Sequence, residues 1–228
     1  MIRPLQLRSF WATLTSFRCL VSVGFAVVAG PVWASCICLT CAVNPALENF
    51  RAVSESMAPT LPTGACAVMR HIDPMAEVVV QGQVIGLEKA PDGPIFVYRV
   101  IGLAGDRIAM QNGQVILNDR PLPQAFIAHD DITMPDGTPR PRCEGTPAPG
   151  EICRRLRYQE TLPNGTRYEV YDIGASSLDE TPAITVPEGH VFVMGDHRDN
   201  ANDSRAPADL GGTGPVPISN IKGVFDGL

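Results

Sequence analysis

The longest apolar stretch of the sequence lies near its N-terminus. Residues 19–43 carry no charged side chain, although two glycines and a proline interrupt the run. About 20 apolar residues are enough to cross a bilayer as a helix, and membrane helices tolerate glycine and proline. Arg3, Arg8 and Arg18 precede the stretch. By the positive-inside rule, this pattern predicts a cytoplasmic segment 1–18, a membrane anchor over 19–43 and an exported body.

Two other interpretations of the N-terminal stretch remain open. A cleavable signal peptide has the same basic start and apolar run, and Ala34 would provide a small-residue cleavage site. Trp33 beside that site and the further apolar residues up to Val43 disfavour it. Lipid attachment at Cys36 is weaker still, because Trp33 stands where an aliphatic residue is usual.

After the anchor, short apolar or alternating segments are separated by turns. The chain has 21 glycines and 21 prolines, and they form turn sequences such as residues 91–93 (PDG) and 163–165 (PNG). Such spacing predicts a mainly β body of antiparallel sheets. Residues 83–88 and 95–101 flank the first of these turns and predict a hairpin, and residues 64–69 predict a further strand.

Composition and charge restrict the class of protein. With 45% hydrophobic and 18% charged residues, the chain is too apolar to be disordered. The net charge is -6, and setting aside Arg3, Arg8 and Arg18 leaves 15 basic against 24 acidic residues, or about -9 for the remainder. A nucleic-acid partner is therefore not expected, because phosphate binding requires a basic face.

Three blocks of residues point to a specific chemistry. They are residues 53–61 (VSESMAPTL), 98–106 (YRVIGLAGD) and 195–205 (GDHRDNANDSR). A serine before Met-x-Pro, taken alone, indicates a capped turn. The three blocks together and in this order resemble the type I signal peptidases, or leader peptidases. That family removes leader peptides from exported proteins with a serine nucleophile and a lysine general base, and the resemblance covers nearly everything after about residue 46.

The resemblance implies a role for both serines of the first block. A serine hydroxyl needs a base to activate it and donors to hold the oxyanion of the intermediate. In the family, the residue matching Ser56 attacks the carbonyl carbon. Its backbone N–H and the hydroxyl of the residue matching Ser54 hold the oxyanion. Residues 57–59 would then present an edge along which an extended peptide can pair.

The third block resembles the part of the family site that braces the active-site loop. The matching residues are Gly195, Asp196, Asp203 and Arg205. Taken alone, the acidic residues could also suggest a metal site formed by Asp196, Asp199 and Asp203. Arg198 and Arg205 are interleaved with them and neutralise the cluster. We therefore expect neither a metal nor a cofactor.

The second block departs from the family at the general base. The lysine of the family stands immediately before the arginine, and here that position is Tyr98. A buried lysine works as a base because burial lowers its pKa, whereas a phenol of pKa about 10 is ionised only about one part in a thousand at pH 7. Ala201 stands where the family usually has a serine that hydrogen-bonds the lysine. The base and its partner are thus both absent.

Few residues could replace that base. The chain has two lysines, Lys89 and Lys222. We expect Lys222 at the surface or in a salt bridge, and Lys89 lies at a hairpin turn, where it reaches the serine only if the strand register differs from that expected. His197 occupies a position of the third block where asparagine is usual, and its imidazole has suitable chemistry. A structural role in the loop is the stronger interpretation.

The order of the blocks predicts two domains. Residues 46–110 and 185–228 would form the catalytic β-domain, and 111–184 an inserted accessory β-domain. Within the insert, residues 156–170 alternate as expected for a strand hairpin, and residues 135–150 indicate an exposed loop.

The cysteines divide into two groups. Four fall in the predicted anchor, where we expect them to act as small hydrophobic residues: Cys19, Cys36, Cys38 and Cys41. Cys66 has small or apolar neighbours and is predicted to be a buried strand residue. Cys143 and Cys153 flank a loop rich in glycine and proline. In an oxidising compartment they are predicted to form a disulfide.

Three functional hypotheses follow. The first is a monomeric, membrane-anchored serine endopeptidase with a rearranged base, in the plasma (inner) membrane with its body outside, whose partners are leader-bearing preproteins and membrane lipid. The second is a pseudopeptidase that binds exported or surface-protein segments without cutting. The third is a maturation peptidase of one secretion system. Ser54 and Ser56 favour an enzyme, and Tyr98 and Ala201 favour the pseudopeptidase.

Overall fold

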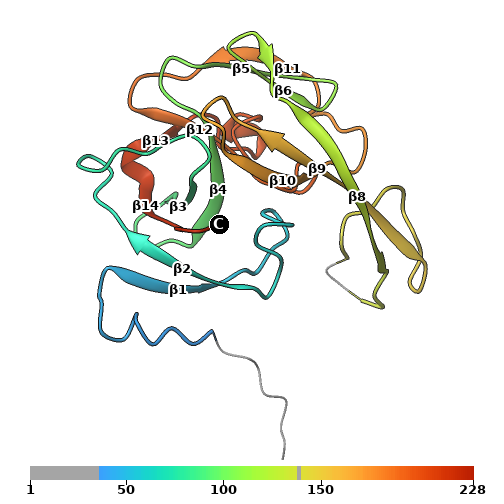
Figure 1. Ribbon diagram of the computed structural model, residues 1–228, viewed down its shortest axis with the longest axis horizontal. Coiled ribbons are helices and arrows are strands. Elements are labelled where there is room, and N and C mark those ends of the chain that lie inside the picture. The colour runs from blue at the N-terminus through green and yellow to red at the C-terminus, as the bar shows by residue number, and fades with distance from the viewer. Residues whose placement is uncertain (1–35, 138–139) are drawn as a thin grey trace, which may run out of the picture. The chain divides into compact units, whose positions relative to one another are not determined.

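The computed structural model describes residues 36–137 and 140–228 (Figure 1). The predicted cytoplasmic segment 1–18 and the first part of the predicted anchor, residues 19–35, lie outside the described residues. The described part of the chain forms fourteen strands and two short 3-10 helices. All strand pairs in its sheets are antiparallel, so the mainly β, antiparallel class predicted from the turn pattern is confirmed. In these residues we find no helix that is long and apolar enough to span a membrane.

The largest sheet carries the segments on which the three sequence blocks lie. Its seven strands, in spatial order, are β1 (Leu47–Arg51), β2 (Cys66–His71), β14 (Ile221–Val224), β3 (Val84–Glu88), β4 (Ile95–Gly102), β12 (His190–Met194) and β13 (Val216–Pro217). The predicted hairpin is confirmed as β3 and β4, with Ile85 opposite Tyr98. Asp92, in its turn, has a φ of 59°, a conformation that aspartate tolerates better than most residues.

Two smaller sheets come from the middle of the chain. One consists of β11 (Thr181–Thr185), β5 (Arg107–Gln111), β6 (Gln114–Leu117) and β7 (Arg120–Pro121), and the other of β10 (Arg167–Tyr171), β9 (Ile152–Thr161) and β8 (Gln124–Thr133). Figure 1 shows β8 and β9 as a long two-stranded ribbon. The two 3-10 helices are η1 (Ala208–Leu210) and η2 (Ile218–Asn220).

One apolar core joins the three sheets. Ile101 of β4, Ile108 of β5, Tyr168 of β10 and Phe192 of β12 pack in a single buried cluster. Residues 36–228 accordingly form one compact unit. Burial of this shared apolar surface is the main force that holds the smaller sheets against the large one. The division into a catalytic domain (46–110 and 185–228) and an inserted domain (111–184) stays a prediction.

The structure corrects the prediction for four cysteines. Cys36 is bonded to Cys66, and Cys38 to Cys41, so Cys36, Cys38 and Cys41 do not act as free hydrophobic residues. Residues 39–43 form turns rather than a helix, and this brings the sulfurs together. Cys66 is exposed at the start of β2, not buried. Cys19 lies outside the described residues.

The remaining two cysteines form a third disulfide. Cys143, in the loop after β8, is bonded to Cys153 of β9, with their Cα atoms 5.2 Å apart. Two backbone hydrogen bonds between Met134 and the 150–151 turn join the two ends of the connection between β8 and β9. The disulfide therefore fixes the loop at the far end of the β8–β9 ribbon.

Candidate functional site

The two serines of the first block lie on the connection between β1 and β2. The backbone turns tightly there, because the Ala58 N–H donates to the Glu55 carbonyl (2.9 Å) and the Leu61 N–H to the Met57 carbonyl (2.8 Å). Met57 and Leu61 are buried in an apolar cluster with strand residues, which fixes the turn against the sheet. The hydroxyl oxygens of Ser54 and Ser56 then lie 3.1 Å apart.

Backbone contacts from the third block hold Ser56 in place. The His197 N–H donates to the Ser56 carbonyl oxygen at 3.0 Å. A Cβ atom at Gly195 would lie 2.5 Å from that same oxygen and would overlap the Cβ of Ala201. Only glycine therefore allows the two segments to approach this closely. Residues that are about 140 positions apart in the sequence meet here.

Ser54, Ser56 and Tyr98 line one cavity of about 250 Å³. Most of its remaining wall is apolar and is formed by Phe50, Ala52, Val53, Met57, Leu61, Pro94, Ile95, Phe96 and Val97. The structure thus brings together the predicted nucleophile, the second serine and the residue at the predicted general-base position. An apolar wall with a few polar groups is typical of a ligand-binding cavity.

Tyr98 does not contact the serines by a hydrogen bond in the described structure. Its side chain is buried in the face of β4, and its hydroxyl donates to the Asn202 carbonyl oxygen at 2.8 Å. Burial, with a smaller contribution from the Asp203 carboxylate, raises the pKa of Tyr98 to about 12. The phenol is therefore neutral and already engaged as a donor at neutral pH.

The predicted bracing residues form two buried ion pairs. Asp196 accepts from the guanidinium of Arg99, at 2.7 and 2.9 Å, and both side chains are buried. Asp203 accepts from Arg205 at 2.9 Å and from the Gly195 N–H at 3.1 Å. Each aspartate thus ties the backbone or side chain of one segment to another. Buried charges are tolerated only when they are paired in this way.

A comparison with known protein families identifies the family of the chain. The family model described as "Signal peptidase, peptidase S26" matches residues 25–226. The chain belongs to the S26 signal peptidase family. Among curated relatives, signal peptidase I of Rickettsia typhi is 31% identical over 135 residues, which is 56% of this chain and 43% of that protein. Signal peptidase I of Rickettsia canadensis is 32% identical over 133 residues, 55% of this chain and 42% of that protein.

This S26 chain spans less than half the length of those relatives. Among solved structures, a signal peptidase I from Enterococcus faecalis matches 65% of this chain and 97% of its own, at 17% identity and a TM-score of 0.35. The description of the fold therefore stands on the sheets and pairings of this chain itself.

The S26 chain has a further buried network that the sequence analysis missed. Arg198 of the third block pairs with Glu160 of β9, and both are fully buried. The Tyr168 hydroxyl donates to the same carboxylate at 2.7 Å, and the guanidinium of Arg99 lies 4.6 Å from the centre of the Tyr168 ring. The network links the sheet of β8–β10 to the loop behind Ser56. No local pattern pairs Glu160 with Arg198, since 38 residues separate them.

Neither of the two lysines of this chain hydrogen-bonds Ser56 in the described structure. Lys222 pairs with Glu88 at 2.7 Å, as the sequence led us to expect. The ammonium of Lys89 lies 4.5 Å from the centre of the Phe96 ring, and burial lowers the pKa of Lys89. Phe96 also lines the cavity of the serines, so Lys89 contacts a residue of its wall but is not itself a lining residue.

His197 is buried behind the serine turn. Its ring packs edge-on against Tyr171, with the ring centres 5.5 Å apart, and neither ring nitrogen has a hydrogen-bond partner in the described part of the chain. Burial, followed by the positive charges of Arg155 and Arg142, lowers the pKa of His197 to about 4. The imidazole is therefore neutral at pH 7, and its backbone N–H, not its ring, contacts Ser56.

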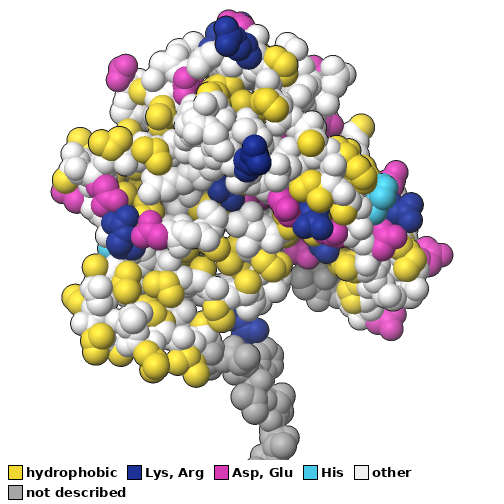
Figure 2. Space-filling model, in the orientation of Figure 1, with side chains coloured by type: hydrophobic (Ala, Val, Ile, Leu, Met, Phe, Trp, Pro, Cys, Tyr) yellow, Lys and Arg dark blue, Asp and Glu magenta, His cyan; other side chains and the backbone are white. Residues whose placement is uncertain are grey.

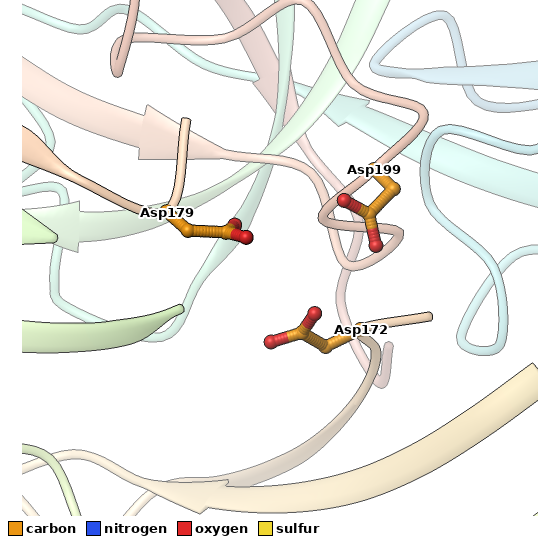
Figure 3. Close-up of side chains that lie close together, drawn as sticks. All are labelled: Asp172, Asp179 and Asp199. Atoms are coloured by element: carbon orange, nitrogen blue, oxygen red, sulfur yellow. The ribbon is translucent and has the colours of Figure 1, made fainter. Parts of the chain in front are cut away.

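The acidic residues Asp196, Asp199 and Asp203 do not form the metal site that the sequence suggested as an alternative. Asp196 and Asp203 are used in ion pairs, whereas Asp199 faces Asp172 and Asp179 (Figure 3), with carboxylate oxygens within 4.8 Å of one another. Burial, followed by repulsion from Asp199 and Asp179, raises the pKa of Asp172 to about 6. Asp172 and Asp179 belong to no motif, so this cluster was not predictable from the sequence.

Proposed function

We propose that this chain is a serine endopeptidase that removes leader peptides from exported preproteins, with Ser56 as the nucleophile. The observation that carries the proposal is the 3.1 Å separation of the Ser54 and Ser56 hydroxyl oxygens at the wall of one apolar cavity. In this role the Ser56 N–H and the Ser54 hydroxyl would stabilise the oxyanion. Gly195, Asp196, Asp203 and Arg205 would keep the turn of Ser56 in place.

The general base is where the proposed enzyme differs from its family. The position expected to hold lysine is occupied by Tyr98, whose phenol is neutral and donates to Asn202. We infer that the phenol does not act as the base and that turnover is slow. Serine proteases that have lost members of their catalytic triad keep about 10³–10⁴-fold of rate over water from oxyanion stabilisation and binding. A slow peptidase with a narrow set of substrates is consistent with this residual rate enhancement.

The same observation favours a second candidate function. A protein that binds exported segments without cutting them needs the apolar cavity beside Ser56, but no base. The cavity has room for short apolar side chains, because its volume is about 250 Å³. Binding and cleavage are distinguished by testing the serine itself.

The decisive experiment uses the purified chain and a leader-bearing precursor. We expect the wild type to cleave it and Ser56→Ala to abolish cleavage. Ser54→Ala should lower kcat by about 10²–10³-fold, as loss of one oxyanion donor does. Ser219→Ala, at an exposed position outside the cavity, is the matched control and should match the wild type. If wild type and Ser56→Ala both bind the precursor and neither cleaves it, the peptidase proposal is rejected in favour of the pseudopeptidase.

We also propose that the body lies against the outer face of the plasma membrane, anchored through residues 19–35, since the disulfides of Cys36 and Cys38 and the turns at 39–43 make the end of the predicted anchor part of the body. In support, large exposed hydrophobic side chains gather over β1 and β2 (Figure 2): Ile37, Leu39, Val43, Val53 and Val68. Contact with lipid would remove this apolar surface from water. Protease added to intact spheroplasts should then digest the body. Protection of the body, or a mature N-terminus near Ser35, would contradict this topology.

A further inference from the structure

The turns that precede β1 carry two cysteines separated by two residues. In the sequence Cys38-Leu39-Thr40-Cys41 the two thiols are joined as a disulfide. Cys38 and Cys41 are both partly exposed, and Leu39 and Thr40 between them are exposed. We propose that this pair is a thiol–disulfide exchange site, which accepts two electrons from two external thiol groups and returns them to an external disulfide.

The hydrogen bonds around the pair are unequal. The Cys41 N–H lies 3.1 Å from the Cys38 sulfur, and the Thr40 hydroxyl oxygen lies 3.3 Å from it. A disulfide sulfur has no hydrogen, so both groups donate to Cys38. Two donors stabilise negative charge on that sulfur as the disulfide breaks. Because exchange is faster when the leaving sulfur is better stabilised, Cys38 is the leaving group and Cys41 is the sulfur that is attacked.

The other two disulfides lack these hydrogen bonds, although Cys66 is exposed. In the described residues, no N–H or O–H group donates to the sulfur of Cys36, Cys66, Cys143 or Cys153. Cys153 is fully buried in β9. The Cys36–Cys66 bond joins residues 30 positions apart and fastens the turn to β2. These two bonds are structural, and the exchange is confined to Cys38 and Cys41.

The reaction balances in two steps. The thiolate of an incoming thiol attacks the Cys41 sulfur, the Cys38–Cys41 bond breaks, and Cys38 leaves as a thiolate. A second thiol then attacks the sulfur that the first one brought, so that Cys41 leaves and the two external sulfurs are joined. Cys38 and Cys41 have then gained two electrons and two protons, which the two external thiols have lost. The co-reactant is thus a thiol, either a small molecule or a protein dithiol.

Reduction at this site leaves the attachment of the turn intact. The Asn49 side chain of β1 donates to the Cys36 carbonyl, and the Cys36–Cys66 bond holds the same turn on β2. Cys66 lies opposite Arg51 in the β1–β2 hairpin. The exchange site therefore opens and closes while the strands around it stay paired.

The test is a timed reduction of the full chain in detergent. The oxidised protein is incubated with reduced glutathione in one arm and dithiothreitol in the other, quenched with acid, alkylated and mapped by mass spectrometry. We expect Cys38 and Cys41 to become free at least about tenfold faster than the other four bonded cysteines in both arms. At early times glutathione should be found on Cys41. Equal rates for the three disulfides, or glutathione on Cys38 instead, would overturn the proposal.

Thr40 provides a matched pair of variants. Thr40→Val removes the donated hydroxyl and should slow the reduction of the pair several-fold, whereas Thr40→Ser keeps the hydroxyl and should restore the wild-type rate. Identical rates in the three proteins would refute the assignment of Cys38 as the leaving group. The measurement requires no peptide cleavage, so its outcome is separate from that of the proposed peptidase function.

Discussion

A lysine introduced at position 98 should convert the proposed slow peptidase into a fast one. The perturbation is the double substitution Tyr98→Lys and Ala201→Ser, which supplies the amine and the hydroxyl partner that the S26 resemblance leads us to expect. Tyr98 and Ser56 already line the same cavity. We therefore expect the double variant to cleave a leader-bearing precursor well above the wild-type rate.

The size of the effect follows from the state of the phenol. The pKa of Tyr98 is about 12, five units above pH 7, so about one phenol in 10⁵ is ionised at neutral pH. Ionising it costs about 7 kcal/mol under those conditions. Position 98 is only 4% exposed, and such burial lowers the pKa of a lysine towards neutrality. A general base contributes about 10²–10⁴-fold in turnover, and the double variant should gain within that range.

The second substitution is needed because of local packing. Ala201 is buried, with its Cβ against the Cα of Gly195. A serine there adds one oxygen, which is buried and needs a partner. The lysine amine would be that partner. Each single variant should therefore gain less than the double, and a double-mutant cycle should show favourable coupling.

The assay is kcat for cleavage of the precursor over a range of pH. In the double variant kcat should rise as pH increases through the pKa of Lys at position 98, because the neutral amine is the base. Tyr98→Met removes the phenol without adding a base and is the control. The reasoning is refuted if the wild type already cuts fast in a Ser56-dependent way and the double change brings no gain. Lys89→Ala and His197→Ala would then be compared to find the base.

Three further predictions concern stability. Glu160→Ala should lower the free energy of unfolding, measured in urea, by about 3–5 kcal/mol, because it leaves Arg198 buried and unpaired. The double variant Glu160→Met with Arg198→Met removes both charges and should lose less of this free energy. Loss of the Cys143–Cys153 bond by paired serine substitution should cost about 2–3 kcal/mol, and finding both thiols free in the native protein would remove that expectation. The folded state holds the Asp172 proton up to pH about 6, above the unfolded value of 3.8, so its contribution to stability falls as pH rises between these values. Asp172→Asn should remove that decline, and an unchanged slope of Tm against pH would contradict it.

Much of the fold was predictable because its signals are local. The turn at residues 91–93 and the alternating segments on either side of it predict the hairpin of β3 and β4, which the structure confirms. The alternation of a strand also separates Tyr98 from Arg99, and their side chains do reach different partners, Asn202 and Asp196. Period-two patterns determine which face a residue occupies without any knowledge of the fold.

The cysteines show where local signals fail. Cys36, Cys38 and Cys41 stand among apolar residues, so hydropathy alone extends the membrane segment over them. What decides their role is their pairing, and Cys36 pairs with Cys66 across 30 residues. The Glu160–Arg198 pair is likewise invisible in the sequence, because the two residues come from separate elements that meet only after folding.

The buried ion pairs explain how the proposed site keeps its shape with tyrosine at position 98. Asp196 with Arg99, and Asp203 with Arg205, fix the loop behind Ser56 through contacts that do not involve position 98. The phenol that occupies the position has its hydroxyl satisfied by the Asn202 carbonyl, so it leaves no unpaired polar group. The residues that hold the turn of Ser56 and the residue at position 98 therefore make different contacts. Exchange of the base should change proton transfer in the proposed reaction while leaving the geometry of Ser54 and Ser56 as it is.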